Sequence, residues 1–205
     1  MKFRTVVNGR FSENCYLLST EDSAVIVDPG EFNAEIEKFC SDNQNKEKVI
    51  LLTHCHFDHI LGAKEIRDKF GYKVYISNHD NQGLTGDELS LCKRFRFNQE
   101  FFSADKLLSD GEKFSVGDLN FTVIATPGHT KGSLCYLLGN LLFSGDTLFY
   151  ETFGRVDLPS GNKDELVESI DKLLLLHDDI KVFSGHGQMT TIAHEKEHNP
   201  YKRYF

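Results

Sequence analysis

The chain has 205 residues, 40% hydrophobic and 26% charged, a composition that excludes disordered and collagen-like proteins and suits one soluble domain spanning residues 1–205. The net charge of −8 argues against a surface made for nucleic acid. No stretch is apolar enough for a signal peptide or a membrane span. We therefore expect a cytoplasmic protein that contacts neither nucleic acid nor membrane, and the sequence leaves its oligomeric state open.

The first half of the chain alternates apolar residues at strand spacing and at helix spacing. Its strands are predicted at residues 3–7, 15–19, 24–27, 48–52 and 73–76, and its helices at 32–40 and from Phe57 to Gly71. The turn Asp28-Pro29-Gly30 closes the third strand, and Gly71 is typical of a helix C-terminus.

The second half repeats this pattern, with strands predicted at 113–116, 119–125, 133–138, 141–144 and 180–184 and a helix at 163–177. Two sheets packed face to face with helices outside, an αββα sandwich of the α/β class, fit both halves. Residues 77–102 between them are compatible with a helix pair or a mobile lid, and the sequence does not decide. We favour core packing over a substrate wall for the phenylalanines of that segment.

The strongest chemical signal is His54-Cys55-His56-Phe57-Asp58-His59, where a buried strand ends. In an extended chain His54 and His56 point to the same side and can reach one ion, whereas Cys55 points away and is not expected to be a ligand. The following turn directs Asp58 and His59 toward a second position. Four coordinating groups in six residues rarely arise by chance.

Three further residues look like completing ligands, because each follows a predicted strand and has glycine close by: His129, Asp146 and His186. Asp146 is the best candidate for a carboxylate that bridges two ions. Site one would then consist of His54, His56, His129 and Asp146. Site two would consist of Asp58, His59, His186 and Asp146.

This ligand set predicts a hydrolase with two divalent ions, zinc first, although iron and manganese suit the same ligands. A hydroxide shared by the metals would attack a carbonyl or phosphoryl centre, and Asp58 would orient it or take its proton. The other histidines, His79, His177, His194 and His198, are interpreted as surface or supporting residues. The five cysteines form no Cys-x-x-Cys pair, so reduced thiols are expected.

The His-x-His-x-Asp-His motif with the later His129, Asp146 and His186 resembles the metallo-β-lactamase superfamily in every ligand position. Thr126-Pro127-Gly128-His129-Thr130, Ser144-Gly145-Asp146-Thr147, Gly154-Arg155-Val156-Asp157 and Gly185-His186-Gly187-Gln188 are most similar to the glyoxalase II (hydroxyacylglutathione hydrolase) group, in its short bacterial form. The resemblance implies the αββα fold and hydrolysis of a small-molecule thioester, with S-lactoylglutathione as the usual substrate.

The chain departs from that group at Asp157, where a glutathione-binding tyrosine is expected, and as a short form it is not expected to carry the group's C-terminal helices. Arg155 and Tyr150 are the remaining candidates for holding the substrate. The main alternative is a persulfide dioxygenase, which would use His54, His129 and Asp146 to hold one iron. Three further hypotheses are disfavoured: a ribonuclease, a β-lactamase and a non-catalytic metal-binding scaffold.

Overall fold

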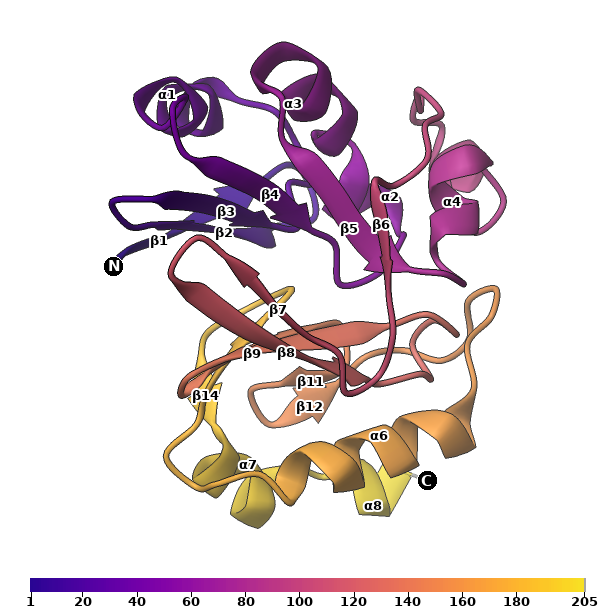
Figure 1. Ribbon diagram of the computed structural model, residues 1–205. Coiled ribbons are helices and arrows are strands. Elements are labelled where there is room, and N and C mark those ends of the chain that lie inside the picture. Colours follow the sequence, from indigo (N-terminus) through magenta and orange to yellow (C-terminus); the bar gives the residue numbers. More distant parts are fainter. Residues whose placement is uncertain (205) are drawn as a thin grey trace.

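Two six-stranded sheets pack against each other in the computed structural model, which describes residues 1–204 (Figure 1). The first sheet runs in the order β1 (Lys2–Asn8), β2 (Glu13–Ser19), β3 (Ser23–Val27), β4 (Glu47–Leu51), β5 (Lys73–Ser77), β6 (Lys106–Leu108). The second runs in the order β14 (Thr190–Thr191), β13 (Lys181–Ser184), β10 (Leu141–Gly145), β9 (Leu134–Leu138), β8 (Leu119–Ala125), β7 (Lys113–Val116). A small hairpin joins β11 (Leu148–Phe149) to β12 (Thr152–Phe153).

Strand direction brings distant loops to one edge of the sandwich. In the first sheet β3, β4 and β5 are parallel. In the second, β10 is parallel to β13, and both β8 and β10 are antiparallel to β9, so β8, β10 and β13 share one direction. The segments that follow β4, β8, β10 and β13 carry the predicted ligands, and the structure places these segments together.

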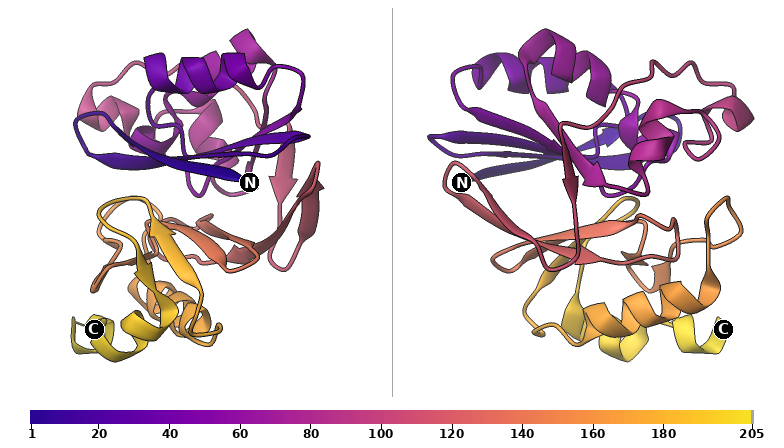
Figure 2. Two further views of the ribbon diagram at one scale, coloured as in Figure 1. Left: turned by 90° about the vertical axis from the view of Figure 1, so that its left-hand side faces the viewer. Right: turned by 45° about the vertical axis from the view of Figure 1, so that its right-hand side comes forward.

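Helices cover the outer face of each sheet, as Figures 1 and 2 show from three sides. The helices of the first half are α1 (Ala34–Asp42), α2 (Phe57–Ile60), α3 (Ala63–Phe70), α4 (Asn81–Thr85) and α5 (Cys92–Phe95), and those of the second are α6 (Lys163–Leu174), α7 (Ile192–His198) and α8 (Tyr201–Tyr204). Asn33 and Asn162 start the longest two, α1 and α6, by accepting hydrogen bonds from backbone amides of the first turn. Gly71 ends α3 in the left-handed conformation, as predicted.

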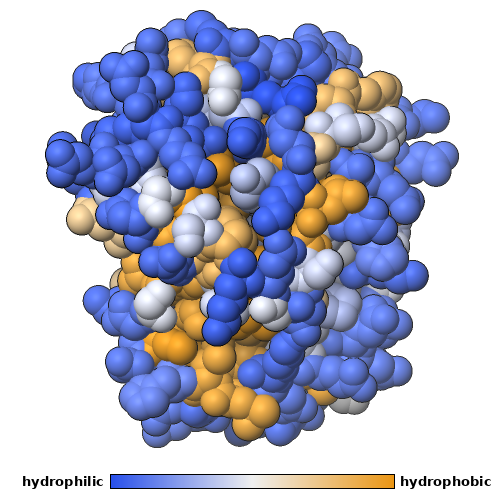
Figure 3. Space-filling view, in the orientation of Figure 1, coloured by the Kyte–Doolittle hydropathy of each residue, from blue (hydrophilic) through white to orange (hydrophobic). Residues whose placement is uncertain are grey.

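Alternation along β2 shows how the layers are joined. Tyr16 and Leu18 point into the apolar layer between the sheets, whereas Cys15 and Leu17 point to the layer beneath α1 and α3. A third apolar cluster lies between the second sheet and α6. Hydrophilic residues dominate the face seen in Figure 3, with hydrophobic ones visible between them through its middle and lower part. The predicted αββα sandwich is confirmed.

The structure differs from two of the predicted helices, and it adds elements that were not predicted: β6, β11, β12, β14, α7 and α8. The helix expected from Phe57 to Gly71 is divided into α2 and α3, because the amide of Gly62 is bound by the carbonyl of Pro29 and a Cβ at Gly62 would lie 2.8 Å from that oxygen. The helix predicted to reach His177 ends at Leu174.

Residues 77–102 form the two short helices α4 and α5 with loops, which is the helix-pair alternative. No helix within residues 1–204 is long and apolar enough to cross a membrane.

Candidate metal centre

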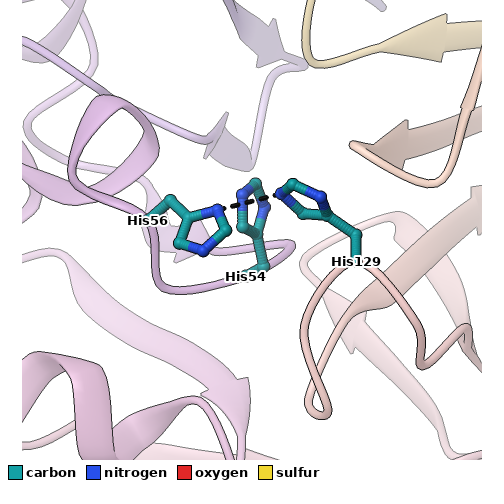
Figure 4. A group of neighbouring side chains, drawn as sticks. All are labelled: His54, His56 and His129. Carbon is teal, nitrogen blue, oxygen red and sulfur yellow. Dashed lines mark hydrogen bonds between the residues drawn. The ribbon is translucent and has the colours of Figure 1, made fainter. Parts of the chain in front are cut away.

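Three imidazoles from the two halves of the chain converge in Figure 4, which places His54 and His56 on the segment after β4 and His129 on the segment after β8. Nε2 of His129 lies 2.9 Å from Nδ1 of His56, and each of the three side chains offers a nitrogen within 4.8 Å of the others. A tetrahedral ion with bonds of about 2.1 Å separates its ligand atoms by roughly 3.4 Å. The spacing of this trio, site one, therefore suits one ion.

Site two is formed by Asp58 and His59 of α2 and by His186, which follows β13. Their ligand atoms also lie within 4.8 Å of one another, and Nε2 of His186 is 3.5 Å from Oδ2 of Asp58. The carbonyl oxygen of Phe11 accepts a hydrogen bond from Nδ1 of His186 at 3.1 Å and leaves Nε2 facing the centre. This group matches the second predicted ligand set.

Asp146 lies between the two groups. One carboxylate oxygen, Oδ1, is 3.5 Å from Nε2 of His59, and the other, Oδ2, is 3.5 Å from Nε2 of His129 and 3.6 Å from Nε2 of His186. Its oxygens therefore face ligands of both sites, in the position predicted for a bridging carboxylate.

Several buried polar atoms at this centre have no hydrogen-bond partner within the described part of the chain: Nε2 of His54, His56 and His59, and Oδ1 of Asp146. Such atoms are rare in folded proteins because they lose their hydrogen bonds to water without replacement. Nitrogen and carboxylate donors with tetrahedral spacing supply what a divalent ion requires, so the residues fit one metal at each site.

Charge favours the same conclusion. Burial, together with the neighbouring His129 and the other imidazoles, lowers the pKa of His54 and His56 well below the ordinary value, which keeps them in the neutral form that binds metal. Burial alone would also lower the pKa of His59, but the carboxylates of Asp146 and Asp28 outweigh it and raise that pKa. The imidazoles of His59, His129 and His186 lower the pKa of Asp146 against the effect of burial.

Asp28, at the end of β3, orients ligands of both sites. Its Oδ2 accepts hydrogen bonds from Nδ1 of His59 at 3.0 Å and from Oγ1 of Thr53 at 2.6 Å, and Oγ1 of Thr53 lies 3.1 Å from Nδ1 of His54. Hydrogen bonds of this kind fix the tautomer of a metal-binding imidazole, so that its other nitrogen is free for the metal. The sequence marks the Asp28 turn but does not reveal this role.

Asp80, just before α4, supports site one and was not predicted. Its Oδ2 accepts hydrogen bonds from the amide of Cys55, at 3.0 Å, and from the hydroxyl of Thr130, at 2.7 Å. Cys55 lies between His54 and His56, and Thr130 follows His129, so this one carboxylate ties the two halves of site one together. Burial raises the pKa of Asp80.

Both predicted substrate residues face solvent. The carbonyl of Arg155 accepts a hydrogen bond from Nδ1 of His129 at 2.8 Å, while its guanidinium makes two 2.7 Å contacts with the carboxylate of Asp157. Tyr150 is exposed and stacks on His194, with ring centroids 4.9 Å apart.

The remaining predictions for histidine and cysteine agree with the structure. Cys55 is buried in the apolar layer beneath α1 and α3, and its thiol is free. His177 pairs with Asp179, and His194 with Glu151. His79 and His198 are exposed, and none of these histidines joins a potential metal-binding group in residues 1–204.

A sequence model described as the metallo-beta-lactamase superfamily matches residues 8–186. The chain belongs to this superfamily. The match spans all seven predicted ligands, and the coarse prediction of a metal-dependent hydrolase of this fold is thereby supported.

Curated relatives of this chain carry different names. "Probable metallo-hydrolase YqgX" of Bacillus subtilis is 34% identical, covering 100% of this chain and 99% of its own. "Hydroxyacylglutathione hydrolase GloC" of Haemophilus influenzae is 35% identical, covering 93% of each chain.

Solved structures add to this range. The BLEG-1 B3 metallo-beta-lactamase superposes with a TM-score of 0.89 at 37% identity, covering 98% of this chain and 99% of its own. TTHA1623 in a di-iron-bound form superposes with a TM-score of 0.86 at 30% identity, covering 97% of this chain and 99% of its own. ETHE1 from Myxococcus xanthus superposes with a TM-score of 0.79 at 30% identity, covering 98% of this chain and 84% of its own. The names range from hydrolase to lactamase, so similarity alone does not select one substrate.

Proposed function

We propose that the protein is a binuclear thioester hydrolase of the hydroxyacylglutathione hydrolase type. The observation that carries this proposal is the meeting of two complete ligand groups at Asp146, whose carboxylate faces His59 of one group and His129 of the other. The similarity to GloC, whose name states this activity, supports the substrate class.

Two divalent ions at these sites would supply an activated water and positive charge for the oxygen of the scissile carbonyl. The seven ligand residues would hold the ions, with Asp146 shared between them. Asp58 is proposed to orient the attacking water and accept its proton, because its carboxylate is partly exposed at the site while lying 3.5 Å from Nε2 of His186. The chain then needs no side chain as nucleophile.

Arg155 and Tyr150 are proposed to face the thiol half of the substrate. The backbone of Arg155 contacts His129, which places the residue at the edge of site one, and its exposed guanidinium can exchange Asp157 for an anionic group on the substrate. Tyr150 follows Phe149, whose ring centroid lies 6.2 Å from that of His186.

A mononuclear iron persulfide dioxygenase is the second candidate, because ETHE1 from Myxococcus xanthus is 30% identical over nearly the whole chain. That reaction would use His54, His129 and Asp146. The hydrolase is favoured because Asp58, His59 and His186 form an equally complete second group.

The deciding experiment measures the metal content of protein purified without added metal, together with hydrolysis of S-lactoylglutathione by the same sample. About two ions per chain together with turnover would support the thioester hydrolase. We expect these ions to be zinc, although iron and manganese suit the same ligands. A single iron, no hydrolysis and oxygen uptake with glutathione persulfide would favour the dioxygenase. Nitrocefin in the same panel tests the activity named for BLEG-1.

A further inference from the structure

A cavity of about 330 Å³ opens beside Asp58, and Arg155 is not among the residues that line it. We call it the Phe11 pocket and define it by the apolar side chains of Phe11, Phe57, Leu61 and Phe97 and by the polar side chains of Asn8 and Glu13, with Asp58 at its border. Its volume lies in the range of cavities that hold drug-sized ligands and exceeds what a three-carbon lactoyl group needs.

Aromatic rings form the wall of the Phe11 pocket. The ring of Phe57 lies 5.0 Å from that of Phe11 and 4.7 Å from that of Phe97, measured between centroids. Phe11 is 40% exposed, and the backbone carbonyl of the same residue holds His186. Phe97 packs on a small separate apolar cluster, in line with the core packing expected for its segment, and it also lines the Phe11 pocket.

Two buried polar side chains of the Phe11 pocket are unpartnered within residues 1–204. The carboxylate of Glu13, which is only 1% exposed, lies near the side chain of Asn8, but neither of its oxygens has a hydrogen bond of ordinary geometry. Nδ2 of Asn8 also lacks one, while Oδ1 of Asn8 accepts from Asn33 at 2.9 Å. An acceptor and a donor side by side are complementary to a hydroxyl group, which both donates and accepts.

The floor of the Phe11 pocket adjoins the metal centre directly. A Cβ at Gly30 would lie 1.7 Å from the carbonyl oxygen of Asp58 and 2.8 Å from Oε2 of Glu13, so only glycine at this position leaves room for both residues. A group held by Glu13 would thus be near a carbonyl bound at the centre.

The two halves of a thioester extend in different directions from its carbonyl. The exposed charges of Arg155 and Asp157 do not line the Phe11 pocket, so the pocket and these charges can take different halves of the substrate. Building on the proposed function, we propose that the Phe11 pocket binds the acyl half of the substrate and that this half is an aromatic 2-hydroxyacyl group. Its ring would pack on Phe11, Phe57 and Phe97, and its hydroxyl would bind Glu13 and Asn8.

The experiment compares S-mandeloylglutathione with S-lactoylglutathione, which share their thiol and their hydroxyl and differ in that a phenyl ring replaces the methyl group. In the metal-loaded protein, Phe97→Ala should lower kcat/KM for the mandeloyl thioester about tenfold, chiefly through KM, and change the lactoyl value less than about twofold. Phe101→Ala is the matched control, because Phe101 is a 52% exposed ring in the same segment that does not line the Phe11 pocket. It should change neither value.

The hydroxyl contact is tested with S-phenylacetylglutathione, which retains the ring and lacks the hydroxyl. Glu13→Gln should lower kcat/KM for the mandeloyl thioester and leave the phenylacetyl value within about twofold. Equal loss for all thioesters in Phe97→Ala, or a wild-type preference for lactoyl above about tenfold, would overturn the proposal. Phe97→Leu serves if the alanine variant does not fold.

Calorimetric titration with mandelate and lactate separates the acyl-binding proposal from the proposed hydrolase activity. If no thioester is hydrolysed but mandelate binds more tightly than lactate, and only while Phe97 is intact, the hydrolase proposal fails and the aromatic binding site stands. If mandelate binding does not depend on Phe97, the Phe11 pocket is not the binding site.

Discussion

The two sites of the metal centre differ in their ligand types and in their burial. Site one consists of the imidazoles of His54, His56 and His129, which are at most 3% exposed. In site two His59 is fully buried, but the side chains of Asp58 and His186 are 17% and 27% exposed. Site one is therefore a closed position fixed within the fold, whereas site two faces the space from which a substrate approaches, with the Phe11 pocket next to it.

Substitution of the residue shared by both sites should have the largest effect. Asp146→Ala removes the carboxylate that faces His59 and His129, so each site would lose the ligand that we propose the two sites share. We expect hydrolysis to fall by more than the ~10–100-fold typical of residues that only support ligands, and metal content to drop below one ion per chain. Elemental analysis and thioester turnover measure both. Retention of two ions with full activity would contradict the bridging assignment.

The supporting carboxylates offer a matched pair for telling the sites apart. Asp80→Asn disturbs the hydrogen bonds to Cys55 and Thr130, so it should weaken metal binding at site one by ~10–100-fold and leave site two nearly unchanged. Competition with a chelator measures the two binding constants. Equal weakening of both sites would show that Asp80 is not specific to site one.

Asp28→Asn should affect both sites. The substitution replaces one carboxylate oxygen with an amide group, which cannot accept hydrogen bonds from Thr53 and His59. Site two contains His59 and should lose ~10–100-fold in metal affinity. Site one should lose less, because Asp28 acts on it only through Thr53 and His54. Asp28 adopts a left-handed backbone with φ of 50°, which asparagine also tolerates, so the fold should persist. The circular dichroism spectrum is the control, and an unchanged chelator titration would refute this role.

Acid should empty the two sites at different pH values. A proton competes with a metal for each imidazole, and the competition begins at a higher pH when the pKa of that imidazole is higher. The pKa of His59 is raised against burial by Asp146 and Asp28, whereas burial and neighbouring imidazoles lower the pKa of His54 and His56. Site two should therefore release its ion first as the pH falls, each step costing about tenfold in affinity per pH unit. Metal release followed with an indicator dye checks the order.

The same shifts act in opposite directions on the stability of the metal-free protein. His54 and His56, with lowered pKa values, favour folding above the ordinary histidine pKa and lose this contribution as the pH falls through it. His59, with a raised pKa, contributes below the ordinary value and loses its contribution as the pH rises through the folded value.

Local patterns in the sequence predict most of the centre. The ligands from His54 to His59 are adjacent, and His129, Asp146 and His186 each follow a strand, so periodicity and strand ends suffice to find them. Asp28 and Asp80 were missed as supporting residues because their partners are distant: 25 residues separate Asp28 from Thr53, and 50 separate Asp80 from Thr130. No spacing rule encodes such pairings.

The same limitation explains the errors in the fold. Helical spacing continues from Phe57 to Phe70, and only the contact of Gly62 with Pro29, a residue of another segment, divides it. The burial of the Glu13 carboxylate likewise depends on a tertiary contact, because Gly30 of another segment lies against it. Sequence reasoning thus succeeds for short-range chemistry and fails where tertiary contacts decide.

The smallest effect is expected on the side of site one that faces solvent. Arg155→Ala removes a guanidinium that is 58% exposed and paired with the 66% exposed Asp157, so the free energy of unfolding should change by less than about 1 kcal/mol. The carbonyl that holds His129 belongs to the backbone and is retained, so metal content should not change. If the guanidinium binds the thiol half, KM for S-lactoylglutathione should rise several-fold with kcat preserved, because binding is lost equally in the ground and transition states.

Asp157→Ala is the matched control: it frees the guanidinium and should lower KM or leave it unchanged. A fall in kcat with unchanged KM in Arg155→Ala would instead assign this residue to the metal centre and erase the division between a thiol side at site one and an acyl side at site two.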